Sequence, residues 1–76
     1  MKRWLLELVR MLVDHPDDVH CVLIQGDTTL IMEIRCHADD IGKVIGKDGK
    51  TVGAMRTLLN AMAARQGRKA VVEVVD

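Results

Sequence analysis

The sequence predicts an α+β protein with the element order helix, strand, strand, short helix, glycine-rich loop, long helix and strand. Apolar residues recur at helical spacing near the start and again after the glycines, whereas three other segments are rich in valine and isoleucine. With 76 residues, of which 49% are apolar, the chain has room for one core. We therefore expect a single domain over residues 1–76, with helices packed on one face of a three-stranded sheet.

The first helix is expected from Lys2 to Asp14, because its apolar and charged residues fall on different sides. His15 precedes Pro16, and the residue before a proline disfavours helical geometry, so the helix should end there. The apolar positions cover about 220° of the circumference, roughly twice the stripe that a surface helix needs. A second surface should cover the excess. The inner side comprises Trp4, Leu5, Leu8, Val9 and Leu12, and Trp4 is expected in the core.

The next two segments, Val19–Gln25 and Thr28–Cys36, are expected to form a β-hairpin around a turn at Gly26 and Asp27. Apolar residues alternate with more polar ones along the second strand, which predicts one covered face and one wetter face. The covered face would carry Leu30, Met32, Ile34 and Cys36.

A short helix, a break and a long helix are expected after the hairpin. Asp39 or Asp40 can cap a short helix that runs through Ile45. Gly46 and Gly49 then interrupt the chain before the long helix.

The long helix is expected from Lys50 to Arg65, with Gly67 placed to end it. The valines of Ala70–Val75 predict a final strand. The inner stripe of the long helix would be Val52, Met55, Leu58, Leu59 and Met62.

The formal net charge is zero, but the charges are distributed unevenly. Residues 1–42 carry four Lys/Arg and eight Asp/Glu, residues 43–69 carry seven and one, and the last seven residues carry two acids. Such a basic block gives a local positive field beside the glycines, which favours an anionic partner. The alternative is a solvated helix face.

The glycine- and lysine-rich stretch Ile41–Thr51 lacks the spacing of a nucleotide-binding P-loop. That motif needs Gly, four residues, and then Gly-Lys-Ser/Thr. Gly49 and Lys50 supply the end of the motif, but Val44 occupies the position of its first glycine. A strand should also lead into a P-loop, whereas a short helix is expected here. Nucleotide hydrolysis is therefore not expected.

The pattern I-G-x-x-I-G-x-x-G-x-x-V, from Ile41 to Val52, resembles that of KH domains, whose GXXG loop would be Gly46–Gly49. The order of elements matches the type II KH fold. Over essentially its whole length the chain is similar to small bacterial RNA-binding proteins of the KhpA type. The resemblance implies a non-catalytic protein that grips the backbone of single-stranded RNA, as a post-transcriptional regulator or an RNA chaperone-like factor.

Physical considerations also favour Gly46–Gly49 as a phosphate site. Glycines permit unusual backbone angles and let another chain approach without a Cβ in the way. The start of the following helix offers unpaired N–H groups and the positive end of its dipole. Lys43, Lys47 and Lys50 add positive charge, whereas Asp48 would repel a solvated phosphate about 4 Å away by on the order of 1 kcal/mol. The alternative is a tight connection between two helices.

By the same resemblance, the RNA bases would lie in an apolar groove between the short helix and the edge strand. Arg68 and Lys69 fall in the variable loop of type II KH domains and would extend the backbone contact, unless they form a solvated turn. The absence of Phe and Tyr argues against modules that stack bases on aromatic rings. The groove would be lined by some of Ile41, Val44, Ile45, Val52, Leu30, Met32 and Ile34.

The neighbours His20 and Cys21, and likewise Cys36 and His37, look like metal ligands but are not expected to bind a metal. With the turn placed as above, Cys21 faces Met32, and Cys36 lies further from the turn. Neighbours in a strand also point to opposite faces. We expect packed, reduced thiols, no cofactor and no catalytic residues.

The sequence contains no apolar run long enough for a membrane span and no signal-peptide pattern, so we expect a cytoplasmic protein without membrane contact.

The outer side of the long helix suggests a second surface. Gly53 costs about 1 kcal/mol relative to alanine in a helix interior, so its presence needs a reason. Together with the wide apolar arc of the first helix, this suggests a homodimer or, by the resemblance, a heterodimer with a larger KH-containing protein. The competing hypothesis to RNA binding is therefore a protein-interaction subunit with a vestigial nucleic-acid site. A monomer remains the alternative. The outer side carries Lys50, Gly53, Ala54, Thr57, Ala61 and Ala64.

Overall fold

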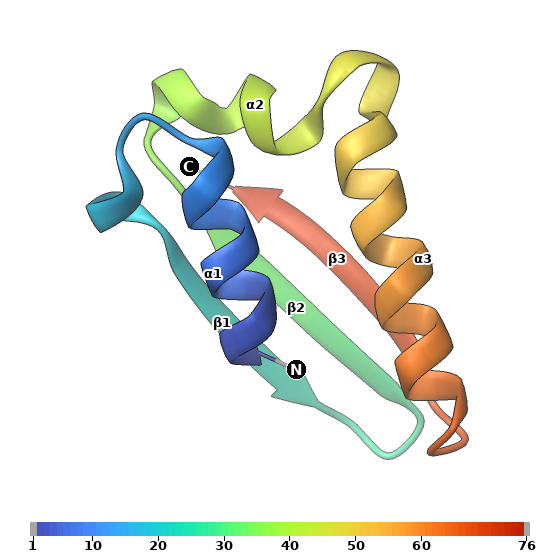
Figure 1. The fold of residues 1–76 in the computed structure, drawn as a ribbon. Coiled ribbons are helices and arrows are strands. Elements are labelled where there is room, and N and C mark those ends of the chain that lie inside the picture. The colour runs from blue at the N-terminus through green and yellow to red at the C-terminus, as the bar shows by residue number, and fades with distance from the viewer. Residues whose placement is uncertain (1, 76) are drawn as a thin grey trace.

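The structure, a computed structural model, describes residues 2–75 and has the predicted order of elements (Figure 1). Short 3-10 turns span Pro16–Asp18, Ala38–Asp40 and Lys47–Gly49. The regular elements are α1 (Lys2–Leu12), β1 (His20–Gln25), β2 (Thr29–Arg35), α2 (Ile41–Ile45), α3 (Lys50–Ala64) and β3 (Lys69–Val75).

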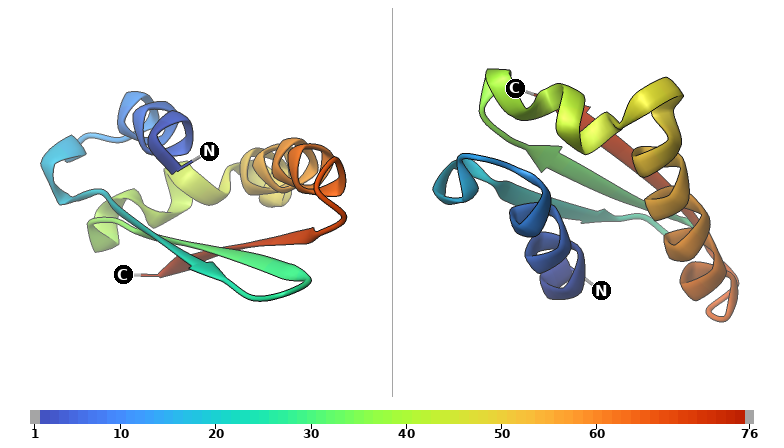
Figure 2. Two further views of the ribbon diagram at one scale, coloured as in Figure 1. Left: turned by 90° about the horizontal axis from the view of Figure 1, so that it is seen from below. Right: turned by 45° about the horizontal axis from the view of Figure 1, so that its top comes forward.

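The strands form a mixed sheet of order β1-β2-β3, in which β1 is antiparallel and β3 is parallel to β2. A parallel neighbour requires a crossover connection, which α2 and α3 supply. The helices all lie on one face of the sheet (Figures 1 and 2). Within residues 2–75, no segment covers the opposite face (Figure 2). The predicted α+β class is therefore confirmed.

The core lies between the helices and the sheet. On β2, the alternate residues Leu30, Met32 and Ile34 are buried, as their spacing predicts. The helices contribute buried residues at intervals of four, which is the spacing of one helix face. These are Leu5 and Val9 of α1, Val44 of α2, and Met55, Leu59 and Ala63 of α3.

Both long helices bury narrower stripes than predicted. Trp4, expected in the core, is 42% exposed, and Leu12 is 38% exposed. On α3, Leu58 and Met62 are 50% and 39% exposed, whereas Leu59 is fully buried. A helix on a sheet contacts it along one row of residues, and a neighbour in sequence is rotated by about 100° away from that row. The predicted wide inner sides were therefore wrong.

The hairpin turn lies one position later than predicted. The Gly26 N–H donates to the Thr29 carbonyl at 2.8 Å. Cys21 consequently pairs with Ile34 rather than with Met32, so the predicted register was wrong by two residues. Because side chains alternate with a period of two, this shift leaves the same residues facing the core.

The end of α3 confirms the role predicted for Gly67. This glycine has φ +72°, and its N–H donates to the Ala64 carbonyl at 3.0 Å. The Arg68 N–H donates to the Ala63 carbonyl, also at 3.0 Å. These two bonds form a Schellman motif, in which glycine adopts the left-handed conformation that ends the helix.

Candidate functional site

The loop Gly46–Gly49 joins α2 to α3 by a series of positive φ angles. Gly46 has φ 81° and ψ 168°, a region that is essentially restricted to glycine. Asp48 has φ 58° and ψ 26°, the left-handed region that Asp tolerates better than most residues. Gly49 has φ 72° and ψ 16° and is the N-cap of α3. The glycines therefore set the angle between the two helices.

The two glycines differ in their surroundings. A Cβ on Gly46 would lie 2.8 Å from the Thr51 backbone nitrogen, so the missing side chain makes room for the first turn of α3. A Cβ on Gly49 would meet nothing within 4 Å. Only Gly49 therefore leaves open space beside the loop for another chain.

The loop is accessible and part of its backbone is unused. Lys47, Asp48 and Lys50 are exposed. The N–H groups of Gly46, Gly49 and Lys50 donate to carbonyls within residues 42–47. Within residues 2–75, the N–H groups of Lys47 and Asp48 have no acceptor, and no side chain caps α3. Two free amides and a helix N-terminus beside two lysine side chains can bind an anion.

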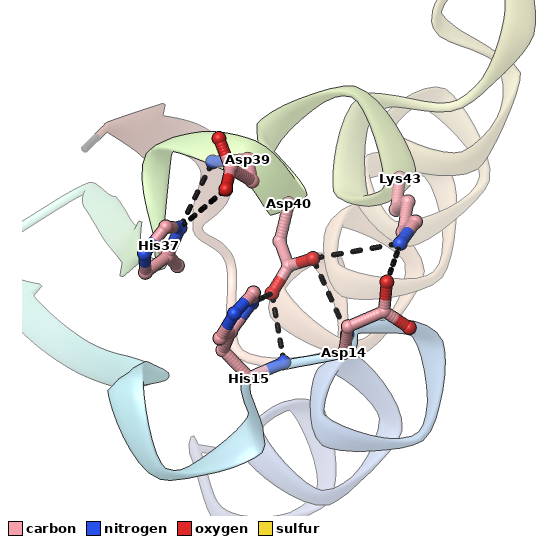
Figure 3. A network of polar contacts seen from close by, with 6 residues as sticks. All are labelled: Asp14, His15, His37, Asp39, Asp40 and Lys43. Carbon is pink, nitrogen blue, oxygen red and sulfur yellow. Dashed lines mark hydrogen bonds and ion pairs between the residues drawn. The ribbon is translucent and has the colours of Figure 1, made fainter.

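The predicted phosphate-binding lysines do not all lie in the same environment. Lys43 points toward Asp14 (Figure 3), and its ammonium group pairs with the Asp14 carboxylate and lies 3.7 Å from Asp40 Oδ1. The positive charge of Lys43 is therefore paired with carboxylates of the protein itself. Lys47 and Lys50 remain beside the loop.

Arg68 and Lys69 lie at the other end of α3 from the loop (Figure 1). The 15 residues of α3 span about 22 Å. Lys69, moreover, is the first residue of β3 rather than part of a loop. The structure therefore does not bring this pair together with Gly46–Gly49.

The predicted apolar lining is only partly accessible. Ile41, Ile45 and Val52 are half-buried on α2 and the first turn of α3, next to the loop. The prediction named seven candidates of which some would line the groove, and the other four are buried in the core: Val44, Leu30, Met32 and Ile34. Leu30, Met32 and Ile34 belong to the central strand, whereas the edge strand next to α2 is β3. Strand order cannot be read from alternation alone, so the sequence did not show that β3 is the edge strand next to α2.

A polar network joins the start of α2 to the segment that follows α1 (Figure 3). Asp40, one of the two predicted caps, occupies the N-cap position of α2, but its fully buried side chain makes no capping hydrogen bond. It accepts hydrogen bonds from the backbone N–H groups of Asp14 at 3.3 Å and His15 at 2.9 Å. His15 Nδ1 lies 3.0 Å from the same carboxylate. The sequence gave no signal of these hydrogen bonds, because His15 and Asp14 lie 25 and 26 residues before Asp40 in the chain.

These contacts shift two pKa values. Burial opposes ionisation of Asp40, but hydrogen bonds from the His15 side chain and the two backbone N–H groups outweigh it, so its pKa lies below the ordinary 3.8. The stabilisation that ionised Asp40 provides is therefore fully present above pH 3.8. It is lost as the pH falls through the lower pKa that Asp40 has in the folded protein. The hydrogen bond to Asp14 raises the pKa of Lys43 above 10.5, against the effect of burial. The stabilisation that the charged Lys43 provides is therefore fully present below pH 10.5, and it is lost as the pH rises through the raised pKa of Lys43.

Residues 2–75 contain no group of three or more His, Cys, Asp or Glu side chains arranged to hold a metal ion. Cys21 and Cys36 are both buried. Among the helices described, none is long and apolar enough to cross a membrane.

The order α-β-β-α-α-β, the parallel pairing of the last two strands and the GXXG loop between two helices define a type II KH fold. Residues 2–74 match the sequence model of the KhpA/KhpB KH domain, and the chain belongs to this family. No solved structure matched the chain.

Among named relatives, the RNA-binding protein KhpA of Chlamydia muridarum is 43% identical over 76 residues, covering 100% of this chain and 97% of that protein. The protein of the same name from Clostridium perfringens is 39% identical over 75 residues, covering 99% of this chain and 100% of its own length. That from Borreliella burgdorferi is 41% identical over 69 residues, covering 91% and 84% of the two chains.

Proposed function

We propose that this protein binds single-stranded RNA through the loop Gly46–Gly49, without catalysis. The observation that carries the proposal is the exposed loop with two free amides at the uncapped start of α3. The names of the KhpA relatives support RNA as the ligand. Lys47 and Lys50 would neutralise phosphates, and the half-buried Ile41, Ile45 and Val52 would contact bases.

Such a site predicts modest affinity. If Lys47 and Lys50 each neutralise one phosphate, log K should fall with log salt concentration with a slope of about −1.4 for a single strand. A protein with so few contacts would act on RNA chiefly when several domains bind together. We propose a post-transcriptional regulator or RNA chaperone-like factor acting in the cytoplasm.

Replacing Lys47 with Asp is expected to weaken binding of a uridine octanucleotide at least about tenfold, because attraction to the phosphate becomes repulsion. Fluorescence anisotropy measures the affinity, and circular dichroism checks the fold. The control is Arg65→Asp, the same change in charge at the far end of α3, about 22 Å away and beyond the Debye length. Equal affinities of Lys47→Asp and the unchanged protein would exclude the loop as the RNA site.

A second candidate function is protein association. Exposed large apolar side chains occur on the helical side of the molecule, at Trp4, Met11 and Leu12 of α1 and at Leu58 and Met62 of α3. On α3, the Asn60 side chain accepts from the Ala70 N–H of β3, so Leu58 and Met62 lie on the opposite flank of the helix. We propose that this side binds a second copy or a larger KH-containing protein.

Sedimentation at micromolar concentration tests the homodimer. We expect a dimer that Leu58→Lys converts to a monomer, because a charge would have to be buried. Val71→Lys, on the open face of the sheet, should leave the dimer intact. A monomeric unchanged protein would contradict self-association.

A further inference from the structure

We infer that Asp40 is a positioning residue for the RNA-binding loop: its buried carboxylate ties the start of α2 to the segment after α1 and so fixes where Gly46–Gly49 lies. The inference rests on the proposed function of that loop.

The first step is that Asp40 holds two distant segments together (Figure 3). Its oxygens accept from the N–H groups of Asp14 and His15, at 3.3 and 2.9 Å, and from the His15 ring at 3.0 Å. The His37 ring stacks on the His15 ring with centroids 4.1 Å apart, which holds that donor in place. Charge-assisted hydrogen bonds of this kind are stronger than neutral ones.

The second step is that, besides Asp40, α2 has one further polar tie to the segment after α1, the ion pair of Lys43 with the exposed Asp14 side chain, and buries little of its own surface. Its five residues span about 7.5 Å, and Val44 is its only fully buried side chain among the residues described. A helix of this length has no stability of its own. Asp40 precedes its first residue, and Gly46 of the loop follows its last, with the Gly46 N–H bonded to the Gly42 carbonyl. A displaced start of α2 therefore displaces the loop.

Neutralising the Asp40 carboxylate should strengthen RNA binding if only its charge matters, and should weaken RNA binding if it positions the loop. Asp40→Asn and Asp39→Asn each remove one negative charge just before α2, and long-range attraction for RNA should strengthen equally in both. The Asp39 side chain is 78% exposed and accepts none of the hydrogen bonds made to Asp40; its carboxylate lies 3.7 Å from His37 Nδ1, so Asp39→Asn is the control for the lost charge. In Asp40→Asn, an amide NH₂ replaces one acceptor oxygen and faces N–H donors.

We expect Asp40→Asn to weaken binding of a uridine octanucleotide about three- to tenfold relative to Asp39→Asn, because the competent loop arrangement is then only fractionally populated. Its salt slope should stay unchanged, since no phosphate contact is lost. By contrast, Lys47→Gln should reduce the magnitude of the slope by about 0.7. If Asp40→Asn does not fold, His15→Ala, which removes the ring contact to Asp40 and the stack on His37 but keeps the backbone N–H bond, should show a smaller loss with the same unchanged slope.

Loop geometry is measured separately in the free protein. The amide chemical shifts of Lys47 and Asp48 should change, and their hydrogen exchange should quicken, in Asp40→Asn or His15→Ala but not in Asp39→Asn. Unchanged loop shifts, or affinity equal to that of Asp39→Asn, would overturn the inference. Failure of the unchanged protein to bind the RNA would refute the proposed function instead, and the loop amides would still decide whether Asp40 positions the loop.

Discussion

Replacing Gly46 with alanine is expected to lower the free energy of unfolding by about 3 kcal/mol or more, the combined cost of a glycine-only backbone region and a steric clash. The backbone at Gly46 has φ 81° and ψ 168°. The added Cβ would lie 2.8 Å from the Thr51 backbone nitrogen, so α3 itself would have to move. Urea denaturation followed by circular dichroism measures the loss.

The matched control is Gly49→Ala. Gly49 also has a positive φ, of 72°, but open space surrounds its missing side chain. We expect a smaller loss of about 1–2 kcal/mol, the cost of the left-handed conformation alone. Equal losses at the two positions would contradict the assigned role of Gly46 in packing against α3.

Replacing Leu59 with alanine is expected to cost about 3 kcal/mol, because it removes a fully buried side chain and leaves a cavity. Only Met55, Leu59 and Ala63 of α3 are fully buried among the residues described, so this helix has few anchors on the sheet. For 76 residues the whole free energy of unfolding is about 4–11 kcal/mol, so the variant should lose roughly a quarter to three quarters of it. Thermal or urea denaturation measures the change.

Leu58→Ala provides the control for chemistry and position. Leu58 is 50% exposed in the single chain, so, at a protein concentration too low for association, the same truncation should cost less than about 1 kcal/mol. The sequence predicted both leucines on the inner stripe, and this pair therefore tests the narrower stripe that the structure shows. Similar losses at both positions would contradict it.

Patterns within one segment were predictable because they report local geometry. The alternation along β2 placed Leu30, Met32 and Ile34 in the core, and Gly67 ended α3 as its position after the helix predicts. The GXXG loop was recognisable for the same reason, since glycines at positive φ leave a direct mark on the sequence.

Contacts between segments that are distant in sequence were not predictable. Lys43 and Lys47 look alike in the sequence, but only the fold shows that Lys43 pairs with Asp14. The two aspartates before α2 look alike, yet one is exposed and Asp40 is buried against residues 25 and 26 positions away. The apolar stripe of a helix likewise does not show how wide a strip of it will be buried against a sheet. Trp4 was therefore wrongly predicted to lie in the core.

The most direct test of the central claim is a titration of the ¹⁵N-labelled protein with single-stranded uridine octanucleotide, followed by amide chemical shifts. If Gly46–Gly49 binds the RNA backbone, the largest changes should occur at the free amides of Lys47 and Asp48 and in the first turn of α3. They should extend to Ile45 on α2 and leave β1 unchanged. Shifts confined to other surfaces, with the loop amides unmoved at saturation, would contradict the claim.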